Sequence, residues 1–454
     1  MAATAQIDGL DAARPGREAG QDGAAVAPTA HWSLAVRVAF RFCFVYFTIY
    51  SLSNQIIGGL LDFPKVNLPD FSLHWPLRQM TFWAAAHVFH VKHALVSTDT
   101  GSGDRVFDWA LAFCLVVSAA VITALWSLVD RRRENYVTLH KWFRLFLRFA
   151  LASEMLLYGL IKVIPVQMPF PYLTRLVEPY GNFSPMATLW SSVGASPAYQ
   201  MFAGSAETLG GLLLLAPRTT TLGALVCLAD LSQVFTLNMT YDVPVKLFSF
   251  HLILFALFLL APEARRILAF FFSDHAVAPS AQPPLCRTRR ANRVAVALQV
   301  LFGLYLGGLS VYGGIQSWRT YGGGRPKPSL YGIWDVEQMS IDGLVRSPLL
   351  TDYDRWRRVL FDSTTAASFQ RMDESFASFG SSISDKNSTL TLTKGSDKAW
   401  KAIFSFDRPA PGQLILDGTM DGHKTRLQLR LVDRSKLMLV SRGFHWINDY
   451  PYQR

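Results

Sequence analysis

The sequence predicts a multi-span α-helical membrane bundle of about seven spans, followed by a C-terminal all-β domain that forms a small antiparallel barrel. Two observations predict the bundle: 50% of the 454 residues are hydrophobic and only 17% are charged, whereas an ordinary soluble domain has about 25% charged residues. A third observation predicts the barrel. Beyond residue 330, long apolar runs give way to short alternating segments that are separated by turn signals.

The helical domain is expected to occupy residues 33–316, after a tail of residues 1–32. The tail is rich in alanine, glycine and aspartate and lacks the apolar stretch of a signal peptide, so we expect it to be disordered. A spanning helix needs roughly 20 mostly apolar residues. Seven segments have this character, at about residues 34–61, 106–129, 145–164, 199–216, 219–239, 246–262 and 294–315.

Two further segments are expected to lie at the membrane interface as short or amphipathic helices. Residues 266–273 are too short to span, and residues 79–95 carry His87, His90 and His93. A metal site is the alternative interpretation of these histidines. Because a chelate usually needs three ligands and carboxylates are missing nearby, no metal is expected.

The loops between the predicted spans indicate an orientation. Basic residues gather in loops 130–144 and 263–293, whereas loop 165–198 carries one cation and one acid. The positive-inside rule places the two basic loops in the cytoplasm. With seven spans, the N-terminus is then cytoplasmic and the C-terminal domain is periplasmic or extracellular, as in a bacterial inner-membrane protein. The same clustering explains the net charge of +11 without a nucleic-acid partner.

The β domain is expected at residues 331–454, after a Gly/Pro-rich linker at 317–330. Strand-like runs occur at 331–340, 356–362, 387–394, 399–406, 413–419, 423–432 and 436–442, and 373–384 adds one or two more. Seven to nine short strands predict an antiparallel barrel or sandwich. The domain contains no cysteine, so its own core must hold it together.

Ionisable residues inside the predicted spans are the main functional signal. Such groups are costly in hydrocarbon and usually face the bundle interior or a wet cavity. Glu154, Tyr158 and Lys162 are spaced i, i+4, i+8 and therefore share one helix face. The predicted polar cluster consists of Glu154, Tyr158, Lys162, Glu207, Asp242, Lys246 and His251. We interpret it as a pocket for a polar headgroup, a quinone ring or a proton; the alternative is interhelical hydrogen bonding worth about 0.6 kcal/mol per contact.

Catalytic residues remain unassigned. The sequence has no P-loop, dinucleotide fingerprint, HExxH or CxxC motif, and no cofactor other than a quinone is considered. The pairs Gly210-Gly211 and Gly307-Gly308 predict close helix approaches, but the oligomeric state stays open.

Three stretches resemble the DoxX-like family of bacterial integral membrane proteins: YGLIKV at 158–163, the glutamate- and glycine-containing helix at 204–225, and NMTYDVPVKLFSFHL at 238–252. The resemblance covers about residues 145–265. It implies a four-helix unit with polar positions at Lys162, Glu207 and Arg218, the last being structural. Some members of the family resemble a thiosulfate:quinone oxidoreductase subunit. A weaker similarity is to the membrane domain related to vitamin K-dependent carboxylases.

The start of the β domain, Gly332-Ile333-Trp334, resembles the Gly-x-Trp motif on the first strand of lipocalins. This resemblance implies a barrel that encloses one apolar ligand. It also implies that a late arginine covers Trp334, and Arg442 matches that position.

Three functions remain open. The first is a membrane accessory protein that binds a quinone or lipid and supports a redox or envelope process. The second is a quinone-linked oxidoreductase subunit, which would need a redox partner subunit because no haem, iron–sulfur or flavin ligation pattern occurs. The third is a transporter, which inverted repeats and broken helices would support.

Overall fold

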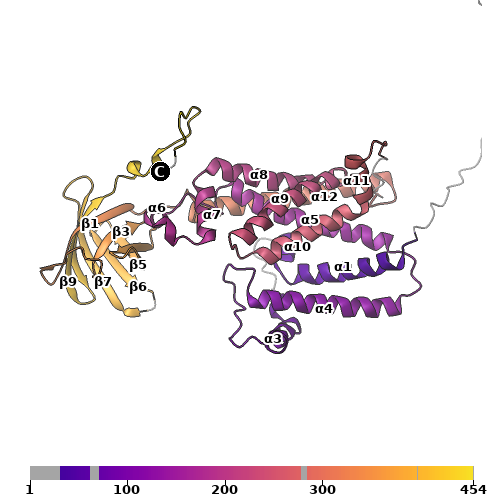
Figure 1. The fold of residues 1–454 in the computed structure, drawn as a ribbon, viewed down its shortest axis with the longest axis horizontal. Helices are drawn as coiled ribbons and strands as arrows, with labels where there is room; N and C mark the ends of the chain where they lie inside the picture. Colours follow the sequence, from indigo (N-terminus) through magenta and orange to yellow (C-terminus); the bar gives the residue numbers. More distant parts are fainter. Residues whose placement is uncertain (1–30, 62–70, 278–283, 396, 453–454) are drawn as a thin grey trace, which may run out of the picture.

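The computed structural model describes residues 31–61, 71–277, 284–395 and 397–452. A bundle of long helices leads into a separate β-barrel (Figure 1). The predicted N-terminal tail lies outside the described residues except for its last two positions.

The bundle consists of long helices that run side by side, with shorter helices at their ends (Figure 1). The long helices are α1 (Leu34–Leu52), α4 (Val106–Val129), α5 (Val137–Val163), α8 (Pro197–Leu214), α9 (Thr220–Thr240), α10 (Lys246–Leu260) and α12 (Arg289–Thr320). The shorter ones are α2 (Gln55–Leu60), α3 (Leu77–His87), α6 (Leu173–Val177), α7 (Pro185–Gly194) and α11 (Ala264–Phe272). A further short helix, α13 (Met438–Ser441), follows the barrel. Single 3₁₀ turns are η1 (Phe71–Leu73), η2 (Tyr180–Asn182), η3 (Pro217–Thr219), η4 (Ala261–Glu263) and η5 (Arg434–Lys436).

Five helical segments in the described ranges are long and apolar enough to cross a membrane: α1, α4, Pro217–Thr240, Lys246–Phe272 and α12. The predicted number of seven is not confirmed, because α5 and α8 are not among them. Helix α5 carries charged residues along its length, yet every residue from Leu147 to Leu156 is buried. Other helices therefore surround the middle of α5 and can receive its charged side chains.

The first predicted span, 34–61, is not continuous, so this prediction is wrong in its second half. Helix α1 ends at Leu52, where the Ser53 hydroxyl donates to Ile49 O at 2.7 Å. Helix α2 then begins at Gln55, and the Asn54 side chain caps it by accepting from Ile56 N at 3.0 Å. Two capping residues in succession thus break an apolar run that is long enough to span.

The two predicted interfacial segments have different outcomes. Residues 264–272 form α11, which exposes Leu268 and three phenylalanines. The predicted helix at 79–95 ends at His87, and His90 has a left-handed backbone with φ of 53°. Within the described ranges, no group of three His, Cys, Asp or Glu side chains is arranged to hold a metal ion.

Glycines bring α5, α8 and α9 into close contact. A Cβ atom on Gly204 would lie 2.5 Å from Gly159 O, and one on Gly210 would lie 2.8 Å from Cys227 Sγ. The predicted close approach at Gly210-Gly211 is therefore present. The prediction for Gly307-Gly308 is not met within the described chain, because nothing lies within 4 Å of either position.

The C-terminal domain is a closed antiparallel barrel, as predicted. Its strands are β1 (Gly332–Ile341), β2 (Leu344–Val345), β3 (Trp356–Phe361), β4 (Ala366–Arg371), β5 (Phe376–Ser384), β6 (Thr389–Lys394), β7 (Asp397–Asp407), β8 (Gln413–Met420) and β9 (His423–Leu431). In the described part of the chain, β2 pairs with β1 alone, and the other eight strands form a ring that β1 and β9 close. This is an up-and-down order, which lipocalins also have.

Three details of the barrel differ from the sequence expectation. Strands β2 and β4 were not predicted, and residues 436–442, expected as a strand, form the end of η5 and helix α13. The barrel is already closed, so it offers no edge with which another strand could pair. The predicted linker at 317–330 is helical up to Thr320.

The lipocalin-like start of the barrel is only partly as expected. Trp334 is buried and its Nε1 donates to Leu330 O at 2.9 Å. Gly332 has φ of 151°, and a Cβ there would lie 2.5 Å from Leu431 Cδ1, so glycine is required. Arg442 does not cover Trp334. It lies in the exposed tail, donates to Asn448 Oδ1 at 2.6 Å and stacks over the ring of Tyr452.

Helix α6 joins the barrel to the loop between α5 and α8. Leu173 packs in a small buried cluster with Ile333 and Leu360 of the barrel, and its backbone N–H donates to Asp362 Oδ2 at 3.0 Å. Gln370 Nε2 donates to Val177 O at 3.3 Å. The barrel is therefore held against the same end of the bundle as loop 165–198 (Figure 1).

A histidine–aspartate pair at the rim of the barrel is expected to give the barrel's stability a pH dependence. His423 Nδ1 lies 2.7 Å from Asp342 Oδ2, and this hydrogen bond raises the pKa of His423 and lowers the pKa of Asp342. The stability contributed by the protonated histidine is lost as the pH rises through its raised pKa. The stability contributed by the ionised aspartate is lost as the pH falls through its lowered pKa. We expect the barrel's melting temperature, measured on the intact chain in detergent, to benefit from the pair only between these two pKa values. A pH profile that Asp342→Asn leaves unchanged would contradict this.

Candidate functional site

Glu154 on α5 is the most deeply buried carboxylate among the predicted site residues, with 1% of its surface exposed. Gln55 Nε2, at the start of α2, donates to Glu154 Oε2 at 2.8 Å and to Tyr158 OH at 3.0 Å. A Cβ on Gly59 would lie 3.5 Å from Glu154 Oε1, so α2 covers this carboxylate closely. The break between α1 and α2 is what brings Gln55 to this position.

Lys162 and Glu207 form a second buried group, with Lys162 about two helical turns beyond Glu154 on α5. Their side chains make an ion pair between α5 and α8 and are 10% and 5% exposed. Asp230 on α9 lies within electrostatic range of both. Glu207 Oε2 and Asp230 Oδ2 are buried atoms without a hydrogen-bond partner among the described residues. Two carboxylates share one ammonium here, so the group can accept one further positive charge, such as a proton.

His251 on α10 forms a third group with two tyrosines of α1. Its Nδ1 donates to Leu247 O at 2.7 Å, because a carbonyl oxygen can only accept. Its Nε2 lies 2.7 Å from Tyr46 OH, and the Tyr50 ring stacks on the imidazole at 3.8 Å between centroids. The histidine is thus fixed in position and orientation.

Electrostatic neighbours connect the three groups into one polar network. Tyr50 is within range of Glu154, and Tyr158 is within range of both Glu154 and Glu207. The polar network consists of Tyr46, Tyr50, Gln55, Glu154, Tyr158, Lys162, Glu207, Asp230 and His251. It runs from α1 and α10 through α5 to α8 and α9. The sequence-predicted residues Glu154, Tyr158, Lys162, Glu207 and His251 therefore come together.

Asp242 and Lys246 belong to a separate group at the turn between α9 and α10. Lys246 Nζ lies 2.9 Å from Asp242 Oδ1 and 3.7 Å from Asp104 Oδ2, and the Asp242 side chain is 82% exposed. Asp104 also accepts from the backbone N–H groups of Lys246 and Leu247 at 2.8 and 2.9 Å, so it caps α10. Sequence reasoning missed this role of Asp104, which is 142 residues from its partner.

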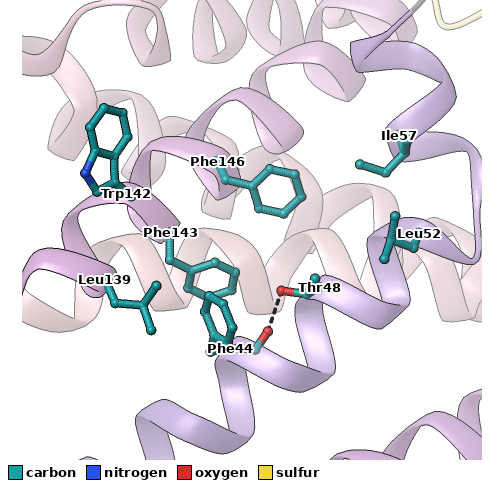
Figure 2. A pocket seen from close by; sticks show the side chains of 8 residues that line it. All are labelled: Phe44, Thr48, Leu52, Ile57, Leu139, Trp142, Phe143 and Phe146. Atoms are coloured by element: carbon teal, nitrogen blue, oxygen red, sulfur yellow. Dashed lines mark hydrogen bonds between the residues drawn. The ribbon is translucent and has the colours of Figure 1, made fainter. Parts of the chain in front are cut away.

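An apolar cavity of about 280 Å³ lies beside the network, between α1, α2 and α5 (Figure 2). This aromatic slot is lined by Phe44, Thr48, Leu52, Ile57, Leu139, Trp142, Phe143 and Phe146. Thr48 is the one hydroxyl residue among these eight, and its Oγ1 donates to Phe44 O at 2.6 Å within α1. Leu52 and Ile57 flank the helix break that carries Gln55, so the slot and the network meet at residues 52–57.

Arg218, which the family resemblance marks as structural, lies in η3 at the turn between α8 and α9. Its side chain is exposed. Among the described residues, no hydrogen bond or ion pair joins it to the polar network.

Part of the chain is similar in sequence to a known bacterial protein. A stretch of 129 residues is 33% identical to the "uncharacterized protein YwoB" of Bacillus subtilis (strain 168), and it covers 28% of this chain and 79% of that protein. No protein-family model and no solved structure matches the chain. Since the name of the relative states no activity, the likeness establishes kinship only.

Proposed function

The chain belongs to the same family as YwoB of Bacillus subtilis, and we propose that it is an integral membrane protein that binds a quinone or another lipid-soluble molecule in its helical domain. The resemblance of residues 145–265 to DoxX-like proteins supports this function. Binding would serve a redox or envelope process. If electrons pass through the bound molecule, a partner subunit must supply them.

We propose a bacterial inner-membrane location, with seven spans, a cytoplasmic N-terminus and the barrel in the periplasm or outside the cell. The barrel docks on α6 of loop 165–198, which carries few charges. The basic helix α11 lies at the opposite end of the bundle (Figure 1). Positive charge at one end of a bundle is typical of its cytoplasmic side.

The observation that carries the proposal is the position of residues 52–57. Their apolar side chains, Leu52 and Ile57, line the aromatic slot, while Gln55 between them bonds to Glu154 and Tyr158. An isoprenoid or acyl chain fits the slot, because its lining is apolar and aromatic. The head of the molecule would then lie near Gln55 and Tyr158. Both N–H groups of Gln55 are engaged by Glu154 and Tyr158, whereas the Tyr158 hydroxyl, which accepts from Gln55, can donate its own hydrogen to a quinone carbonyl.

Proton-coupled transport is a second candidate. The unpartnered oxygens of Glu207 and Asp230 favour it, and so does the break between α1 and α2, because broken helices are typical of transporter sites. Proton uptake into vesicles that contain the purified chain distinguishes this candidate from binding alone.

Filling the aromatic slot tests the proposed binding. We expect Thr48→Phe to abolish retention of a lipid-soluble molecule, because the added ring occupies the cavity. Mass spectrometry of small molecules retained after mild detergent extraction measures the effect. Thr236→Phe is the matched control: this threonine also donates to the carbonyl four residues before it, at 2.8 Å, but is exposed on α9. Equal retention by both variants, or none by the unaltered protein, would refute the proposal.

A further inference from the structure

A groove of about 2410 Å³ lies between α1, α5, α9, α10, α11 and α12, at the end of the bundle away from the barrel. Its lining is strongly basic and includes Lys141, Arg144, Arg148, Arg218, Arg265 and Arg293. Among the described residues, Glu263 is the one carboxylate in this lining, and it pairs with Arg266 at 2.9 Å. The basic groove therefore has a large excess of positive charge and favours an anion.

Two guanidinium groups of the basic groove are partly or fully buried. Arg148 has no acidic partner among the described residues, whereas Arg144 has Glu263, which already pairs with Arg266, within electrostatic range. Arg148 is only 6% exposed; it donates to Gln299 Oε1 and lies 3.5 Å from Thr220 Oγ1. Arg144 donates to Leu259 O at 3.1 Å. The Nε atoms of both arginines are buried and have no acceptor among the described residues. A buried cation without a counter-ion is costly, so an anion that reaches these donors would bind favourably.

Much of the remaining lining of the basic groove is apolar. Leu222 and Leu225 of α9, Val296 of α12 and Ile267 and Phe270 of α11 contribute to its walls. Helix α11 contributes its two arginines and Phe271 to the lining, and its Leu268 and Phe272 are exposed outside the lining. A free inorganic anion would gain nothing from contact with these apolar side chains. A molecule with a phosphate head and acyl chains is complementary to both the basic and the apolar side chains of the groove.

We propose that the basic groove binds an acidic phospholipid of the surrounding membrane, with its phosphate at Arg144 and Arg148 and its acyl chains along α9, α11 and α12. This site is separate from the aromatic slot and does not depend on the proposed function. Arginine suits the role because its planar N–H donors match phosphate oxygens. The lipid would fix α11 against the bundle and supply counter-charge that the described residues do not provide there.

Native mass spectrometry of the intact chain tests the proposal. The protein is released from vesicles of phosphatidylglycerol or of phosphatidylcholine, and bound lipids are counted. We expect saturable retention of phosphatidylglycerol, no comparable retention of phosphatidylcholine, and no displacement by inorganic phosphate. Arg148→Gln should lower retention about tenfold, because one charge-assisted hydrogen bond to phosphate is lost. Equal retention of both lipids would overturn the proposal, and so would displacement by inorganic phosphate, which would mark a site for the free anion.

Two further variants keep the test decisive if the buried Arg148→Gln protein does not fold. Arg293→Gln lies in the basic groove at an exposed position and should also weaken retention of phosphatidylglycerol. Arg132→Gln is the matched control, because Arg132 is an exposed arginine at the same end of the bundle and does not line the groove. If Arg293→Gln and Arg132→Gln change retention equally, general surface charge and not the groove holds the lipid.

Discussion

Replacement of Lys162 by methionine is expected to destabilise the helical domain by about 3–5 kcal/mol, which is the usual cost of removing one partner of a buried ion pair. The substitution preserves most of the side-chain volume but leaves Glu207, with its side chain 5% exposed, without its cation. Asp230 loses the same neighbour. Unfolding of the purified protein by a denaturing detergent, followed by circular dichroism, measures the loss.

Two controls separate charge from packing in this prediction. The double variant Lys162→Met with Glu207→Leu removes both buried charges and should recover most of the lost stability. Lys246→Met removes a cation whose nearer partner, Asp242, is 82% exposed. Its second partner, Asp104, lies 3.7 Å away and keeps two backbone N–H donors, so the loss should be about 1 kcal/mol or less. Two results would contradict the prediction: equal losses of unfolding free energy in Lys162→Met and Lys246→Met, or a double variant no more stable than Lys162→Met. Either would mean that the unpaired charge of Glu207 is not what destabilises the protein.

The helices were largely predictable because apolar length is a local property of the sequence. The break after Leu52 was not predictable in this way, because the mean hydropathy of a long apolar run changes little when two polar residues lie within it. Ser53 and Asn54 are both residues that cap helices, and this was the available signal. Helix α5 shows the opposite difficulty. Its charged residues make it too polar to rank among the apolar spanning segments, although its middle is fully buried among other helices.

The barrel shows where strand patterns mislead. Residues 436–442 are as apolar as a strand, but β9 already pairs with β1 and closes the ring. Strand β4 was missed because its sequence, AASFQR, has little hydrophobic alternation. Whether a segment joins a sheet depends on the presence of a free edge, which a local pattern does not reveal.

The candidate site was predictable only along one helix. The i, i+4, i+8 spacing correctly placed Glu154, Tyr158 and Lys162 on one face. Their partners come from distant parts of the chain: Gln55 is 99 residues from Glu154, and Tyr46 is 205 residues from His251. Gln55 and Tyr46 are uncharged, so they do not stand out in an apolar segment as ionisable residues do, and nothing in the sequence singled them out.

Substitution of Gly204 by leucine is expected to separate α5 from α8 and to cost about 3 kcal/mol, at the upper end of typical overpacking effects. A Cβ at this position would lie 2.5 Å from Gly159 O and from Lys162 Cβ, and 2.8 Å from Val163 N. Two of these are backbone atoms, so the clash cannot be relieved by a side-chain rotation. Separation of the helices would also pull Lys162 away from Glu207, and the polar network would open at its centre.

The matched control for this substitution is Gly307→Leu on α12. This position is also a glycine in a long helix, but nothing lies within 4 Å of a Cβ atom there. Leucine should therefore change stability by no more than about 0.5 kcal/mol, as surface substitutions usually do. Detergent unfolding and the yield of monodisperse protein give the comparison. A loss at Gly307 as large as that at Gly204 would mean that α12 packs against a second surface, and that the close contact of α5 and α8 is not what sets the difference.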